Sequence, residues 1–110
     1  MSKPAFFVYI LASLSGTLYV GMTDDLPLRL QQHRNGTYDG FTRKSGIHRL
    51  MYYETFGDSH AARAREKQIK KYSRAKKTAL FTKSNPGWKD LSVDLYGVRR
   101  IPSPRKQLRG

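Results

Sequence analysis

The sequence has no cysteine, few acidic residues and no long apolar run. The lack of cysteine excludes disulfides, thiolate zinc sites and a cysteine nucleophile, and it is compatible with a reducing cytosol. The apolar stretch at residues 5–12 is far shorter than the roughly 20 residues of a membrane-spanning helix. Lys3 is the one charged side chain before it and a second β-rich run follows, so a strand is a better interpretation than a secretion signal. We expect a cytoplasmic chain without a membrane anchor.

The acidic residues number only 8, against 21 lysines and arginines, which gives a net charge of +13 and a pI near 10.4. A length of 110 residues corresponds to one domain. A surface this basic attracts polyanions and accelerates their encounter with the protein. The composition therefore predicts a nucleic-acid partner, with a merely basic protein as the alternative.

The first part of the chain predicts a β-hairpin. Residues 6–12 and 17–22 are rich in β-branched and aromatic residues, and Ser13, Ser15 and Gly16 mark a turn between them. Because side chains alternate along a strand, Tyr9 and Tyr19 are expected on the same face, directly opposite or one diagonal apart. Both tyrosines can also be ordinary amphipathic sheet residues.

A helix is predicted after this hairpin. An aspartate pair ending at Asp25 can cap it, Pro27 suits its first turn, and Asn35-Gly36 ends it. Arg29 and His33 are four residues apart and share a face. An arginine fits phosphate geometry and a histidine exchanges protons near neutral pH. The alternative is that both side chains are simply exposed.

Basic residues gather in the second half of the chain. We expect a third strand at residues 48–56 and a long helix over residues 60–78, capped by Asp58 or Ser59. The loop at 36–46 adds two further cations. The residues expected to contact nucleic acid are Arg43, Lys44, Arg63, Lys67, Lys70, Lys71 and Arg74.

Glu66 is the one acid of the predicted long helix. Ala62, Glu66, Ile69 and Ser73 form one stripe of that helix, which places the carboxylate beside small and apolar residues. A carboxylate in this position can bind a hard divalent cation. The alternative is a surface ion pair with a neighbouring lysine or arginine, which contributes at most about 1 kcal/mol.

A turn and a basic tail follow the long helix. Residues 85–88 carry a strong turn signal, and residues 91–97 favour neither a helix nor a strand. Residues 97–110 contain no acid, and we expect a disordered basic tail there.

Two short motifs resemble those of the GIY-YIG nucleases. Tyr19-Val20-Gly21 resembles the YIG half, and Phe7-Val8-Tyr9 resembles the GIY half, although it keeps only the tyrosine. Residues 18–26, 65–71 and 85–88 are similar to the small, stand-alone bacterial branch of the family. The resemblance covers roughly residues 4–96. It implies an α+β fold, an α/β sandwich in which helices flank a three-stranded antiparallel sheet, with the nuclease-like domain at residues 1–96.

The resemblance also implies a site and a reaction. The family's catalytic positions match Tyr9, Tyr19, Arg29, His33, Glu66 and Asn85. Glu66 would bind one Mg²⁺ or Mn²⁺, Arg29 would stabilise charge on the scissile phosphate, and the tyrosines would position or deprotonate water. His33 would assist proton transfer and Asn85 would support the cleft. The products would carry a 5′-phosphate and a 3′-hydroxyl.

Three functional hypotheses follow. The first is a metal-dependent DNA endonuclease of low sequence specificity, selective for structure or single strands, since the chain has no room for a separate DNA-reading domain. The second is a non-catalytic nucleic-acid-binding module with the same fold. The third is a subunit that needs a partner chain. We expect a monomer or weak homodimer. RNA as the substrate stays open, as does the pathway, for which DNA repair is one candidate.

Overall fold

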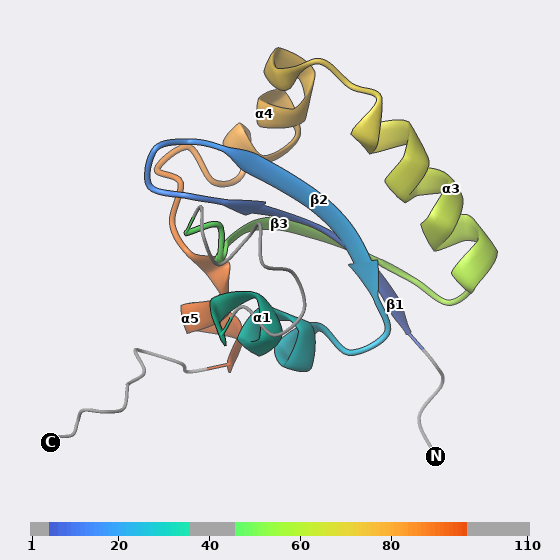
Figure 1. The fold of residues 1–110 in the computed structure, drawn as a ribbon. Helices are drawn as coiled ribbons and strands as arrows, with labels where there is room; N and C mark the ends of the chain where they lie inside the picture. The colour runs from blue at the N-terminus through green and yellow to red at the C-terminus, as the bar shows by residue number, and fades with distance from the viewer. Residues whose placement is uncertain (1–4, 36–45, 97–110) are drawn as a thin grey trace, which may run out of the picture.

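The computed structural model describes residues 5–35 and 46–96. In chain order the elements are β1 (Phe6–Ala12), β2 (Leu18–Thr23), α1 (Leu26–Asn35), β3 (Arg49–Phe56), α3 (Ser59–Lys70), α4 (Arg74–Thr82) and α5 (Leu91–Tyr96) (Figure 1). The predicted tail at 97–110 and the predicted contacts at Arg43 and Lys44 lie outside these residues.

The sheet has the strand order β2-β1-β3 with both neighbouring pairs antiparallel, so the predicted three-stranded antiparallel sheet is confirmed. Tyr9 pairs with Gly21, and Tyr19 pairs with Leu11. The two tyrosines are therefore one diagonal apart on the same face, as the alternation predicted. β2 is therefore an edge strand of the sheet.

Helices cover both faces of the sheet. α3 and α4 lie on one side, and α1 and α5 lie on the other (Figure 1). The core on the α3 side contains Val8, Ile10, Ala12, Val20, Met51, Ala62, Ile69 and Phe81. The core on the α1 side contains Tyr9, Leu11, Leu26, Leu30, Ile47 and Leu50. Both cores use alternate residues of β1, which explains why this central strand is apolar on both faces.

The single long helix predicted over residues 60–78 is wrong. α3 ends at Lys70, and a new helix, α4, begins at Arg74. Ser73 has an extended backbone, and its hydroxyl accepts a hydrogen bond from the N–H of Lys76. A serine side chain can cap the N-terminus of a helix instead of lying inside one, and such a cap divides what the sequence pattern predicts as one continuous helix. Ser73 therefore does not belong to the stripe that carries Glu66.

Aspartate side chains cap the N-termini of α1 and α3. Asp25 accepts the N–H of Leu28 at 3.2 Å, so it caps α1 as predicted. Asp58, rather than Ser59, caps α3 by accepting the N–H of Ala61 at 2.9 Å. Residues 91–96, which the sequence left undecided, form a short helix.

Within the described ranges, the helices are all too short or too polar to cross a membrane.

Candidate active site

Three aromatic rings meet on the α1 side of the sheet. The hydroxyl of Tyr9 lies 3.0 Å from Nε2 of His33, and both side chains are fully buried. The ring of Tyr19 is 5.0 Å from that of His33 and 6.5 Å from that of Tyr9, measured between centroids. His33 is therefore a core residue in contact with both tyrosines, which contradicts the alternative of an exposed histidine.

Gly21 makes this packing possible. It lies opposite Tyr9 on the neighbouring strand, and the phenol of Tyr9 lies against its backbone. A Cβ atom at this position would be 2.5 Å from the Tyr9 hydroxyl oxygen and 3.1 Å from Cε2 of Tyr19. The sequence had assigned no role to this glycine beyond its place in the motif. Its role is to leave space for a buried tyrosine.

Arg29 lies one helical turn before His33 on α1. Its side chain is partly buried, and its Nε donates to Oε1 of Gln32 at 3.2 Å. A terminal nitrogen contacts the carbonyl of Met22 at the longer distance of 3.5 Å. Because Met22 belongs to β2, the guanidinium lies beside the edge strand that carries Tyr19 and Gly21.

Glu66 lies on the other side of the sheet, on α3, which contacts β1 and β2. Only 7% of the residue is exposed, so the predicted inward position is confirmed. Lys70 lies 3.1 Å from one carboxylate oxygen and Arg63 lies 3.5 Å from the other. Both cations are more than half exposed. The ion pairs that were the alternative are therefore present, and their cations are also exposed to a ligand in solution.

The carboxylate of Glu66 fits a cation that is held jointly with a substrate. Among the described residues, no group of three or more acids or histidines forms a metal cluster. Mg²⁺ commonly uses one or two carboxylates and fills its remaining positions with water and substrate phosphate. The single carboxylate of Glu66 meets that minimum, and water and substrate phosphate would supply the remaining ligands.

Asn85 lies away from the aromatic cluster. It is buried, and its amide nitrogen donates to the carbonyls of Lys89 at 2.9 Å and Met51 at 3.4 Å. Its amide oxygen accepts the N–H of Lys89 at 2.9 Å. These bonds close the turn that follows α4 and hold it against β3. The described contacts of Asn85 are therefore those of a framework residue.

Replacing Asn85 with alanine is expected to lower the free energy of unfolding by about 2 kcal/mol, because the backbone groups it satisfies lose their partner. Urea denaturation measures this loss. Ser84→Ala, which changes an exposed neighbour, should stay within about 0.5 kcal/mol of the wild type. Equal midpoints for Asn85→Ala and the wild type would contradict the framework role.

The basic residues divide between two helices and the link that joins them. Arg63, Lys67 and Lys70 belong to α3, Lys71 follows it, and Arg74 opens α4; all five are exposed. Arg74 also donates to the carbonyl of Gly16 at 2.7 Å, so it braces the β1–β2 turn.

A hydrogen-bond network around Glu54 was not predicted from the sequence. Arg65 forms two 2.9 Å hydrogen bonds to the carboxylate of Glu54 on β3, and the hydroxyl of Tyr52 donates to the same carboxylate. The bond from Arg65 holds the pKa of Glu54 below its usual value. Burial and the bond to Glu54 raise the pKa of Tyr52 to about 12. This network ties α3 to the sheet next to Glu66. Its only sequence signal was a lone acid on a strand face.

Known proteins share this architecture. The model of the GIY-YIG catalytic domain matches residues 5–79. A UPF0213 protein of Desulfotalea psychrophila is 33% identical over 98 residues, which cover 88% of this chain and 89% of that protein. A UPF0213 protein of Syntrophus aciditrophicus is 40% identical over 73% of this chain and 92% of its own length.

A solved structure agrees with these matches. The solution NMR structure of a UPF0213 protein from Bacillus halodurans is 29% identical and superposes with a TM-score of 0.51, covering 81% of this chain and 95% of that one. The two tyrosines, the helix after the hairpin and the Glu66 helix all fall within the matched catalytic domain. The chain belongs to the GIY-YIG family, among its small stand-alone members that carry the name UPF0213.

Proposed function

We propose that this chain is a metal-dependent endonuclease that hydrolyses phosphodiester bonds in DNA with low sequence specificity. The observation that carries the proposal is the buried hydrogen bond between Tyr9 and His33, with Tyr19 packed against it, in a GIY-YIG catalytic domain. A phenol and an imidazole in contact form a proton-transfer pair. The exposed cations of α3 and α4, on the other side of the sheet, would supply phosphate contacts.

The geometry supports a different role for each of these side chains. Tyr19 is only partly buried, so it is the phenol that can orient the attacking water. As water attacks phosphorus, the Tyr19 oxygen would take its proton and the Tyr19 phenolic proton would pass inward to the buried Tyr9 oxygen, whose own proton would pass to Nε2 of His33. Arg29, at the β2 edge, stabilises the charge on the phosphate oxygens. The 3′ oxygen leaves and takes a proton from solvent.

Glu66 completes the proposed site from the α3 side of the same edge strand. Its carboxylate would hold Mg²⁺ or Mn²⁺, which neutralises phosphate charge and polarises the bond to phosphorus when bound. Lys70 and Arg63 balance the carboxylate before substrate arrives and then turn to phosphate. We propose a cytoplasmic location for this activity and a part in DNA repair.

A non-catalytic binding module is the second candidate. The net charge of +13 favours it, since electrostatic binding to DNA or RNA needs no intact active site. The buried Tyr9–His33 pair argues against it, because a surface that only binds phosphate gains nothing from such a pair.

Removing the metal should separate these candidates. Purified protein, as a monomer or weak homodimer, is incubated with supercoiled plasmid, single-stranded DNA and a branched duplex in Mg²⁺, Mn²⁺ or EDTA. We expect nicking with either cation and none in EDTA, with DNA binding retained in all three. Binding without turnover on any of these substrates would instead support the binding module.

A further inference from the structure

The β1–β2 turn presents an exposed leucine. Leu14 is 89% exposed, against 48% for Leu28 and 36% for Val93, which are the other exposed large hydrophobic residues described. The remaining residues of the turn at 13–17 are serines, a glycine and a threonine. An apolar side chain this exposed contributes almost nothing to the core, so it is available for contact with a ligand.

Two arginines hold the turn in place from different elements. Arg49 of β3 donates to the carbonyl of Ser13 at 3.0 Å and to that of Trp88 at 2.9 Å. Arg74 of α4 donates to the carbonyl of Gly16 at 2.7 Å. The turn is therefore braced at both ends, and two positive charges contact its backbone. A rigid apolar tip on a cationic base suits insertion into a polyanion with stacked bases.

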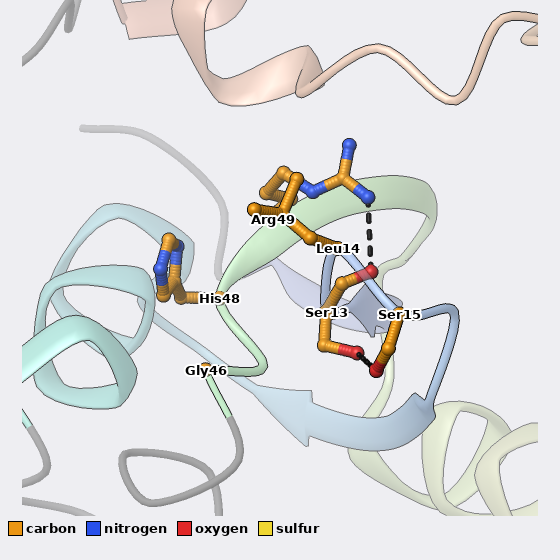
Figure 2. Close-up of a pocket in the computed structure, with 6 residues that line it drawn as sticks. All are labelled: Ser13, Leu14, Ser15, Gly46, His48 and Arg49. Carbon is orange, nitrogen blue, oxygen red and sulfur yellow. Dashed lines mark hydrogen bonds between the residues drawn. The ribbon is translucent and has the colours of Figure 1, made fainter.

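A hollow of about 410 Å³ adjoins this tip (Figure 2). Its volume lies within the roughly 300–1,000 Å³ typical of small-molecule pockets. The described lining residues are Ser13, Leu14, Ser15, Gly46, His48 and Arg49. The first three come from the turn and the others from the segment that enters β3, as Figure 2 shows.

The lining suits an uncharged planar ring. Burial and the charge of Arg34 lower the pKa of His48, so its imidazole stays neutral at neutral pH. The hydroxyl of Ser13 accepts the N–H of Thr17 at 3.0 Å and bonds to that of Ser15 at 2.8 Å, and the exposed Ser15 hydroxyl can also bond to a base edge.

We propose that this turn and hollow form a subsite for one unstacked nucleotide of the DNA substrate. Leu14 inserts into the base stack, the hollow receives the displaced base, and Arg49 and Arg74 lie behind the flanking phosphates. The proposal rests on the proposed nuclease function and specifies its substrate: DNA with a bulged or unpaired nucleotide near the cleavage site. Unstacking is least costly at such positions, which gives the subsite its selectivity.

The subsite lies within reach of the cleavage chemistry. Leu14 and Tyr19 are five residues apart, and an extended chain spans at most about 3.6 Å per residue, so their Cα atoms are within about 18 Å. That distance corresponds to roughly five steps along one DNA strand at about 3.4 Å per step.

A 2-aminopurine assay in EDTA tests this without requiring cleavage. The wild-type chain is titrated into a duplex with one bulged 2-aminopurine and into the fully paired duplex. We expect a fluorescence rise on the bulged duplex and tighter binding to it. Leu14→Ser should remove the rise and reduce the preference for the bulge about tenfold, the factor expected when burial of one leucine is lost. Ser15→Phe, which fills the hollow, should do the same.

Val93→Ser is the matched control, since it removes an exposed apolar side chain from α5 and should behave as wild type. Equal responses of Leu14→Ser and the wild type overturn the subsite, as does a wild-type chain that binds both duplexes equally. Failure of plasmid nicking together with an intact 2-aminopurine response removes the nuclease function but supports the subsite. Because Leu14 and Ser15 are exposed, Leu14→Ser and Ser15→Phe are expected to melt at the wild-type temperature.

Discussion

Replacing Glu66 with glutamine is expected to lower the rate of metal-dependent DNA cleavage at least about 100-fold, while the chain stays folded. Glutamine keeps the size of the side chain but removes the charge that would hold the cation. The two ion pairs lost involve cations that are more than half exposed, so the loss of stability should not exceed about 1 kcal/mol. Plasmid nicking in Mg²⁺ and Mn²⁺ measures the first effect and thermal melting the second.

DNA binding in EDTA separates this effect from a binding defect. Glu66→Gln raises the net positive charge and frees Lys70 and Arg63, so its affinity for DNA should equal or exceed that of wild type. Asp24→Asn makes the same change of charge at an exposed acid and should cleave normally. A Glu66→Gln variant that cleaves at the wild-type rate would remove Glu66 from the proposed chemistry.

The sequence predicted the hairpin of the sheet because two runs rich in β-branched and aromatic residues are separated by turn residues. Local sequence patterns also place Tyr9 and Tyr19 on one face of the sheet and Glu66 on the inner side of its helix. The structure agrees with the hairpin and with both of these positions. The break between α3 and α4 could not be predicted in this way. A serine in a helical pattern is compatible with the interior of a helix, and only the three-dimensional path of the chain makes Ser73 a cap.

The parts of the site that escaped prediction depend on contacts between distant segments. His33 is polar and its neighbours on α1 gave no sign that it is buried, because the burial comes from the two tyrosines of the sheet. Arg65 was one of many basic residues, and only the approach of α3 to β3 shows that it serves Glu54. In each case the residue type indicated polarity, whereas its role is set by a partner on another element.

The largest purely steric effect is expected at Gly21. Replacing it with alanine would put a methyl group 2.5 Å from the Tyr9 hydroxyl oxygen and 2.6 Å from Cζ. Ordinary contacts begin near 3.4 Å, so the phenol must move by about 1 Å. Tyr9 is fully buried and bonded to His33, and it cannot move without breaking that bond or displacing its neighbours. Overpacking of this kind costs about 1–3 kcal/mol.

Cleavage should fall more than stability does. A displacement of about 1 Å of a group that handles protons can cost roughly 100-fold in rate. We therefore expect Gly21→Ala to remain folded, with a lower urea midpoint, and to nick plasmid roughly 100-fold more slowly than wild type. Gly57→Ala is the control, because a methyl group there meets no atom within 4 Å. Wild-type cleavage by Gly21→Ala would mean that Tyr9 can shift without loss of function, and the proposed proton transfer from Tyr9 to His33 would then have to be abandoned.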